Sequence, residues 1–353
     1  MGIDTIPSTE TLRQRLDAQA KLLLPLINEA SIEFLVNVEV QCTALASGHV
    51  PLDADVTPFD NSQTKKEGVS RTYKGFDGYA PMAAYLGREG YCLEMELHEG
   101  KQHCQSGTPA FLKRVLEKTR RITDKPILLR LEGGNDAIEN IATVLAHNEQ
   151  TTEQPPVDFL IKWNPRRESR EEWLAYAEAH AQWTQQEKTW QGDDYSLPRV
   201  MRVIERSVDK HGQQLLVPEI ELEGWWSSLD LAPEKVIALY ADHGTSEQFH
   251  SEFKTDLDAE RLPSGKFDTN ALVLSCTALA YNILRWIGQN GLIGPMAPIR
   301  HPAKRRRIQT VMQELMYLAA CVVRSGRRIK LAFGRQCRVK PIFDQLYTRL
   351  VYG

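Results

Sequence analysis

The sequence predicts a mixed α/β fold with helical terminal regions and a β-rich segment inside the core. The apolar segments 127–131 and 157–162 have the length and composition of buried strands. Residues 50–57 alternate apolar and polar side chains, which is typical of a half-buried strand. A Glu-Gly-Gly turn joins segment 127–131 to a helical pattern over 135–147, the order of an α/β crossover.

The N-terminal part of the chain is predicted to be helical up to Gly48. Ser8 can cap a first helix, which Pro25 interrupts, and a second helical stretch covers 28–45. Pro58 ends the strand at 50–57, and the polar residues 60–78 indicate a loop. A strand pair at 79–86 and 91–97 follows, and then a helix over 109–123.

The C-terminal half begins with a helix predicted over 167–186. Strand patterns at 200–206 and 214–222 indicate a β-rich insertion over 189–235. Helices are expected over 270–287, 310–324 and the C-terminus, with a strand at 330–333. We therefore expect a helical region over 1–48, a core in two parts over 49–188 and 236–353, and the insertion between them.

The composition is that of an ordinary globular protein. The chain has 353 residues, 42% hydrophobic and 25% charged residues, and a net charge of −3. This near-neutral charge permits local basic patches without predicting a polyanion-binding surface overall. The six cysteines have no CxxC spacing, so neither a zinc site nor a disulfide framework is expected. No run of 18 apolar residues and no signal peptide are present, so a cytoplasmic protein without a membrane partner is expected.

Three carboxylates occupy positions suited to metal chemistry. Asp55 lies in the first strand, Glu132 at the end of a later strand, and Glu247 on a helix. Hard oxygen ligands on separate rigid elements can hold two Mg²⁺ ions for phosphoryl transfer. Helical spacing also places Glu247 and Lys254 on one helix face. An ordinary solvated helix face is the alternative interpretation of that stretch.

With these residues in view, the chain resembles the DDE transposases of bacterial insertion sequences, in the branch with the YREK signature. Tyr240, His243, Glu247 and Lys254 hold the signature positions with its spacing. LDADVTPFDNSQTKKEGVSRTYKGFDGYAP resembles the block around the first catalytic Asp, and RLEGGNDAIENI resembles the block around the second acid. The resemblance runs from about residue 7 to residue 350. The helical N-terminal region is expected to be a truncated DNA-binding part.

The resemblance implies a ribonuclease H-like mixed sheet flanked by helices and a two-metal site using Mg²⁺ or Mn²⁺. Asp55, Glu132 and Glu247 would be the catalytic metal ligands, and Tyr240, His243 and Lys254 would contact DNA. The implied chemistry is nicking of an element end, hairpin formation and strand transfer. The implied partners are double-stranded DNA, as terminal inverted repeats and target, and a second copy in a synaptic dimer. The implied location is the bacterial nucleoid.

Two positions depart from the family pattern. The second acid is usually Asp, whereas Glu132 places its carboxylate one methylene further out. The signature arginine is His243, which cannot make a bidentate phosphate contact. A catalytically impaired copy that only binds DNA is therefore the alternative function, and a ribonuclease H-like nuclease with another substrate is a third.

Further residues have open roles. Basic side chains predicted to bind DNA are Lys65, Lys66, Lys304, Arg305, Arg306 and Arg307, with a solvated helix end as the alternative for the last four. Asp53 shares the strand face of Asp55 and competes for its ligand role, and Asp136 could replace Glu132. Trp225 and Trp226 could stack on a flipped base or lie in the core, and His250 could be structural or contact DNA.

Overall fold

A computed structural model describes residues 7–165, 181–209, 212–293, 305–326 and 328–352. The chain divides into two compact units. We call residues 44–56 and 102–246 the sheet unit, and residues 1–43, 57–101 and 247–353 the helical unit.

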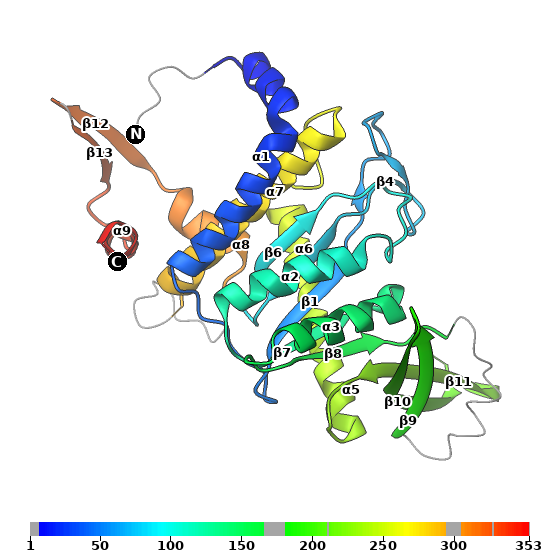
Figure 1. Ribbon diagram of the computed structural model, residues 1–353. Helices are drawn as coiled ribbons and strands as arrows, with labels where there is room; N and C mark the ends of the chain where they lie inside the picture. The colour runs from blue at the N-terminus through cyan, green and yellow to red at the C-terminus, as the bar shows by residue number, and fades with distance from the viewer. Residues whose placement is uncertain (1–6, 166–180, 210–211, 294–304, 327, 353) are drawn as a thin grey trace. The chain divides into compact units, whose positions relative to one another are not determined.

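The sheet unit is built on a mixed sheet (Figure 1). Its strands are β1 (Val50–Val56), β7 (Ile127–Leu131), β8 (Val157–Lys162), β9 (Ala181–Trp190), β10 (Asp193–Val208) and β11 (Gln214–Ser227). They lie in the order β1-β7-β8-β11-β10-β9, with β1, β7 and β8 parallel and the others antiparallel to their neighbours. This arrangement confirms the predicted mixed α/β class and is consistent with a ribonuclease H-like core.

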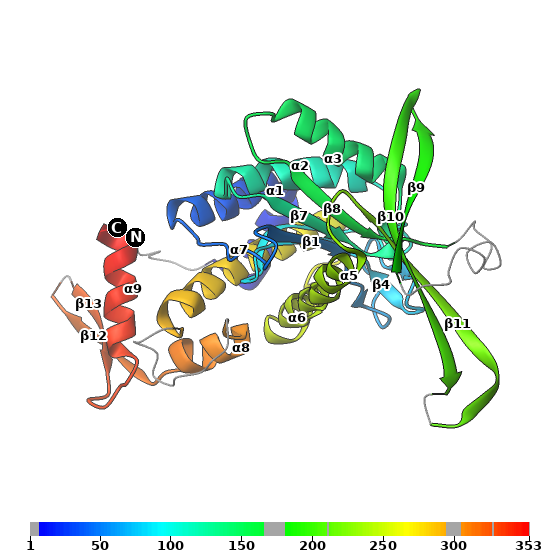
Figure 2. The same cartoon turned by 90° about the horizontal axis from the view of Figure 1, so that it is seen from below.

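Helices cover both faces of this sheet. Figure 2 shows α2 (Thr108–Ile122) and α3 (Ile138–Gln150) on one face and α5 (Pro233–Ala241) on the other. The short helices η1 (Gly133–Asn135) and η2 (Asp242–Gly244) follow β7 and α5. Leu128, Leu160, Trp225, Val236 and Tyr240 belong to one buried cluster, so α5 is held by apolar contacts with the strands.

The helical unit pairs two long helices. They are α1 (Thr9–Asn37) and α7 (Phe267–Gly291), which pack together, and α7 also packs on β6. The unit's strands are β2 (Phe59–Asp60), β3 (Ser70–Arg71), β4 (Asp77–Tyr79), β5 (Met82–Leu86), β6 (Tyr91–Glu96), β12 (Ala320–Ser325) and β13 (Arg328–Phe333). Its other helices are the π-helical turn η3 (Glu252–Asp256), α8 (Ile308–Val311), the π-helical turn η4 (Met312–Met316) and α9 (Lys340–Tyr352). Helix α6 (Thr245–Ser251) runs from one unit into the other.

Three of the predicted helices, over 28–45, 167–186 and 310–324, were wrong in part. Helix α1 continues through Pro25. Proline has no backbone N–H, so one helix carbonyl lacks its usual partner. Pro25 is exposed, so water can donate a hydrogen bond to that carbonyl instead. The second predicted helix, over 28–45, therefore ends at Asn37 as the end of the same helix, with no helix beyond it. The sequence signal was correct in kind but not in length.

In the other two predicted helices, part of the segment is a β-strand. Residues 181–186 of the helix predicted over 167–186 belong to β9, which pairs along its length with β10, while residues 167–180 lie outside the described part. The predicted helix at 310–324 stops at Met316, and Ala320–Ser325 forms β12. The β-branched Val322 and Val323 favour an extended conformation, and antiparallel pairing with β13 stabilises the strand.

Helix α7 is long and apolar enough to cross a membrane by length and composition alone. More than half of its most apolar window, 56%, is nevertheless buried inside the protein. Asn282 is fully buried in it and bonds the β6 backbone: its Oδ1 accepts from Cys92 N at 2.8 Å, and its Nδ2 donates to Cys92 O at 2.7 Å. Nδ2 also donates to Ser31 of α1 at 3.0 Å. Asn282 therefore connects α7 to both β6 and α1.

This connection predicts a stability effect. Replacing Asn282 by Ala leaves a backbone N–H and a C=O of Cys92 without that partner, and we expect a loss of about 2–4 kcal/mol in unfolding free energy. Urea unfolding measures it. Asn37→Ala, at an exposed site on α1, is the matched control and should change stability by less than about 0.5 kcal/mol. Equal effects at both positions would contradict the connecting role.

Candidate active site

The ends of β1 and β7 bring two predicted ligands side by side in the sheet unit. The parallel register pairs Asp53 with Arg130 and Ala54 with Leu131, so Asp55 and Glu132 continue it as the next pair. Glu132 keeps an extended backbone beyond β7. Side chains two residues apart on a strand share a face, so the contact between Asp53 and Arg130 places Asp55 and Glu132 on that same face.

Asp53 and Arg130 form a buried ion pair one step before these acids. Arg130 Nε donates to Asp53 Oδ1 at 2.6 Å and Nη2 to Oδ2 at 2.8 Å. The side chains are 1% and 3% exposed. Arg130 Nη1 also donates to the α5 carbonyl of Leu239 at 2.8 Å and lies 3.4 Å from Asp242 Oδ2. Asp53, the competitor for the ligand role of Asp55, is thus fully engaged inside the protein.

His243 joins this ion pair to Glu132. Its Nδ1 lies 3.0 Å from Asp53 Oδ1, and its Nε2 lies 3.5 Å from Glu132 Oε1. The His243 side chain is 3% exposed, whereas that of Glu132 is 42% exposed. Within the described residues, Nε2 is buried and makes no hydrogen bond of good geometry. The imidazole therefore stands between a buried carboxylate and one that reaches the surface.

The charges of this cluster shift its pKa values. Burial opposes ionisation of Asp53, but the charges of Arg130 and His243 outweigh it and hold the pKa of Asp53 below its usual value. Burial alone would lower the pKa of His243, yet the Asp53 carboxylate outweighs it and raises that pKa. An imidazolium fits this position, because it can donate toward Asp53 and Glu132 at once.

Tyr240 lies beside the two strand ends. Burial, followed by the charges of Glu132 and Asp55, raises the pKa of Tyr240, which keeps its phenol protonated. Its Oη is buried, and its hydroxyl is directed to the Glu132 carboxylate. Its ring packs near Trp225, with centroids 5.9 Å apart, and near His243 at 5.6 Å. Tyr240 thus presents a hydroxyl donor next to both acids.

The third predicted ligand, Glu247, belongs to the helical unit and follows His243 by four residues in the chain. It lies exposed on α6. Lys254, on the π-helical turn η3, donates to the carbonyl of Pro58 at 2.5 Å and is half-buried. The convergence of Glu247 with Asp55 and Glu132 concerns both units and stays a prediction.

The predicted DNA-binding cations of the helical unit differ in their engagement. Arg305 bonds Glu252 at 2.6 Å, Arg306 bonds Glu314 at 2.7 Å, and Arg307 bonds Asp256 at 2.9 Å. A phosphate would have to compete with these carboxylates. Lys66 donates to Asn61 and to the carbonyl of Leu262, Lys65 is exposed, and Lys304 lies outside the described residues. DNA binding by all six stays a prediction.

The tryptophans of β11 are core residues. Trp225 and Trp226 are 2% and 1% exposed. The Trp226 ring lies 4.6 Å from the Arg199 guanidinium and 4.3 Å from Lys188 Nζ, and its Nε1 donates to Asp136 at 2.8 Å. A flipped base would have to displace these contacts, so the core interpretation is confirmed over base stacking.

The structure also gives the surroundings of Asp136 and His250, whose roles the sequence left open. Both Asp136 oxygens accept hydrogen bonds, from Trp226 and from the Asn164 amide at 2.7 Å, so this carboxylate serves the local packing rather than replacing Glu132. His250 is buried in the helical unit, with Nδ1 3.2 Å from Tyr85 Oη. Its contacts are those of a structural residue.

The donor chemistry of the strand ends fits a hard divalent cation. Asp55 and Glu132 supply carboxylate oxygens, the ligands that Mg²⁺ and Mn²⁺ prefer, and both reach partly exposed positions. Among the described side chains, no group of three His, Cys, Asp or Glu residues already forms a metal cluster. A third oxygen donor is the role that the resemblance implies for Glu247, and it stays a prediction.

Sequence reasoning gave no role to Arg130 or Asp242. A signal for Arg130 was present: it precedes Glu132 by two residues, as Asp53 precedes Asp55. A charged residue two positions before each predicted ligand shares its strand face and can pair with its counterpart in a parallel register. No comparable signal marks Asp242.

The fold and this pair of acids define a class of mixed α/β proteins that carry two carboxylates at the ends of neighbouring parallel strands. The chain belongs to the Transposase DDE domain group 1 family, whose model matches residues 20–352. Among solved structures it is similar to a piggyBac transposase in a synaptic complex with hairpin DNA, studied by cryo-EM, with 11% identity and a TM-score of 0.38. That alignment covers 67% of this chain and 46% of the piggyBac chain, so the chain spans less than half of its length. No curated protein sequence matches the chain.

The buried ion pair predicts an asymmetric response to mutation. Asp53→Ala leaves Arg130 charged in the core without its buried carboxylate partner, and we expect a loss of about 3–5 kcal/mol in unfolding free energy. The double variant Asp53→Leu/Arg130→Met should recover most of that loss, because no buried charge remains. Urea unfolding measures both. Glu221→Ala removes the exposed Arg206–Glu221 pair and should cost at most about 1 kcal/mol. A double variant no more stable than the single one would contradict the explanation.

The raised pKa of His243 predicts a pH dependence. Its stabilising effect is complete below the pKa of an unfolded histidine, about 6.5, and is lost as pH rises through the folded value. The stability difference between wild type and His243→Asn should therefore shrink from pH 6 to pH 9. Burial lowers the pKa of His147, so the corresponding difference for His147→Asn should change with the opposite sign. The same trend for both variants would refute the assignment.

Proposed function

We propose that this chain is a DNA transposase of a bacterial insertion sequence that cuts and joins the element's ends. Support comes from the family match and from the signature spacing of Tyr240, His243, Glu247 and Lys254. The observation that carries the proposal is the parallel register of Asp53 with Arg130 and Ala54 with Leu131, which puts Asp55 and Glu132 next along the two strands, beside Tyr240. The reaction would be phosphoryl transfer: nicking, hairpin formation and strand transfer.

Asp55, Glu132 and Glu247 would hold two Mg²⁺ or Mn²⁺ ions. Bound there, such ions lower the pKa of attacking water and neutralise charge on the phosphate that is transferred. The protein's own contribution is to hold the two strand-end carboxylates at fixed spacing, which the buried Asp53–Arg130 pair does.

Other side chains would bind and orient the DNA. The protonated Tyr240 Oη lies beside Glu132 and would donate to a phosphate oxygen next to the acids. Lys254 and the exposed Lys65 would add point charges along the DNA backbone. The substrates would be terminal inverted repeats and target DNA, bound by a synaptic dimer in the bacterial cytoplasm.

A second candidate function is an impaired copy that binds DNA ends without cutting them. Glu132 favours it, because its carboxylate extends one methylene beyond that of Asp, and misplacement by about 1 Å can cost on the order of 100-fold in rate. His243 favours it too, because the imidazole is buried and turned toward Asp53, where it provides no phosphate contact.

The two candidates predict different cleavage results. We expect purified protein to nick DNA carrying the element's ends in Mn²⁺, and Asp55→Ala and Glu247→Ala to abolish nicking without loss of fold. Glu234→Ala, at an exposed position on α5, is the matched control and should leave nicking unchanged. Labelled end-containing DNA on denaturing gels gives the readout.

The outcome separates the candidates. If wild type shows no nicking and Glu132→Asp restores it, the impaired-copy function stands. If neither protein cuts but both bind DNA in a salt-dependent manner, only the binding function survives. Nicking that persists in Asp55→Ala would refute the site assignment.

A further inference from the structure

The ion pair beneath the acids fixes how β1 lies against β7. Asp53 and Arg130 are register partners, and their two hydrogen bonds are 2.6 and 2.8 Å long. A one-residue slip would turn both charges to the opposite, apolar face and leave them unpaired. Asp55 and Glu132 are the next pair along, so the same constraint fixes their spacing.

Arg130 extends this constraint to the helical segment on the same face. Its Nη1 donates to the carbonyl of Leu239 at the end of α5, and lies 3.4 Å from Asp242 of η2. A C-terminal helix carbonyl is a favourable partner for a cation. The segment that carries Tyr240 and His243 is thus held to the two strands by one guanidinium.

His243 completes the connection to Glu132. Its Nδ1 contact with Asp53 at 3.0 Å sets the ring orientation, and this directs Nε2 to Glu132 Oε1 at 3.5 Å. The side chain is 3% exposed, so a DNA phosphate cannot reach it without rearrangement. The orphaned buried Nε2 and the half-exposed carboxylate are natural partners.

We propose that Asp53, Arg130 and His243 form a positioning cluster in which His243, instead of contacting DNA, orients the Glu132 carboxylate for metal binding. The catalytic part of this inference rests on the proposed function; the contact itself does not. The cluster acts as a hydrogen-bonded support for a ligand, the kind of partner whose loss typically costs 10–100-fold in metal affinity. In this proposal His243, which stands where the YREK signature has arginine, has a positioning role specific to this chain.

The first test measures the contact independently of activity. In protein labelled with ¹⁵N-histidine, Glu132→Ala should shift the His243 Nε2 resonance, while Nδ1 stays bonded to Asp53 and shifts little. Glu234→Ala is the control, because Glu234 is exposed in the first turn of α5. This substitution should shift neither nitrogen of His243. If Glu132→Ala leaves Nε2 unchanged, the positioning role is overturned, whether or not the protein cuts DNA.

The second test separates positioning from DNA contact. His243→Asn keeps a donor toward Asp53 but has no group in place of Nε2. We expect its half-saturating Mn²⁺ concentration for nicking to rise about tenfold, with DNA affinity in EDTA unchanged. Weaker DNA binding with unchanged Mn²⁺ dependence would overturn the proposal in favour of a phosphate contact.

A folding control keeps the second test interpretable. The double variant Asp53→Leu/Arg130→Met removes the support without leaving a buried charge, and it should show the same direction of Mn²⁺ shift in a folded protein. A folded double variant with the Mn²⁺ dependence of wild type would contradict the cluster's role. Wild type that cuts nothing while Glu132→Ala shifts Nε2 would refute the proposed function and leave the positioning contact standing.

Discussion

The Asp53–Arg130 ion pair is the constraint on which the sheet unit depends. Taking two charges out of water costs several kcal/mol per ion, and their attraction offsets this only when every donor and acceptor is satisfied. Here the remaining bonds come from Leu239, Asp242 and His243, all from the α5–η2 segment. The cost of burial therefore makes strand register and helix placement interdependent, and both determine where the two acids stand.

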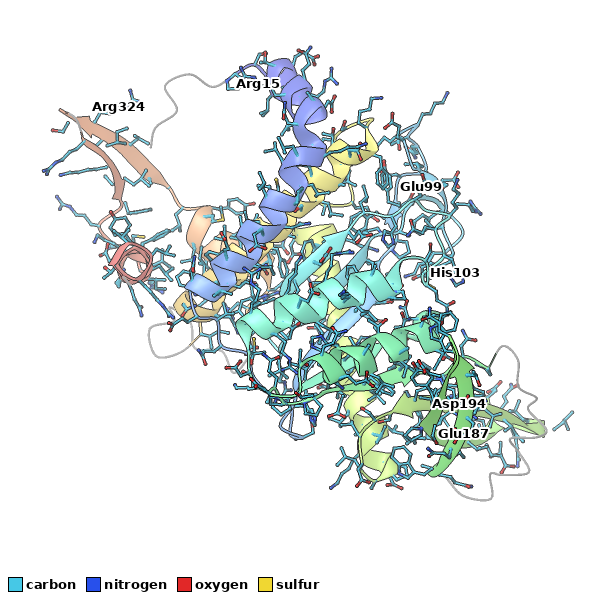
Figure 3. All side chains as sticks on the ribbon, in the orientation of Figure 1. Arg15, Glu99, His103, Glu187, Asp194 and Arg324 are labelled. Atoms are coloured by element: carbon cyan, nitrogen blue, oxygen red, sulfur yellow. The ribbon has the colours of Figure 1, made fainter. Side chains whose placement is uncertain are left out.

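The helical unit also contains a buried ion pair, five residues after its predicted ligand Glu247. Glu252, on the π-helical turn after α6, is buried and bonded by Arg285 of α7 and by Arg305. A π-helical turn shifts the side chains that follow it, which is a recurrent feature of functional sites. Arg305, Arg306 and Arg307 of the basic segment are each paired with a carboxylate of the helical unit. On the β12–β13 hairpin, by contrast, Arg324 is exposed (Figure 3).

The sequence predicted the apolar strands well and the charged core poorly. Both β7 and β8 have the bounds that their apolar runs indicate, because a buried parallel strand must be apolar throughout its length. The first part of β9, residues 181–186, was predicted as helix because its polar, glutamine-rich sequence has weak preferences, and pairing with β10 decides its conformation. Burial of Asp53 and Arg130 was not predictable from either residue alone, since only the register brings them together.

The same register explains why a histidine suits the position where the YREK resemblance predicts arginine. Asp53 already receives two bonds from Arg130, so a second guanidinium there would bring two fixed charges together in a buried space. An imidazole adds a single donor on one side and a second nitrogen on the other, where Glu132 stands. The longer Glu132 side chain needs an anchor that a shorter Asp would not, because it has one more rotatable bond to fix. The two positions that depart from the predicted YREK pattern, His243 and Glu132, thus lie 3.5 Å apart, and each gives a physical reason for the other.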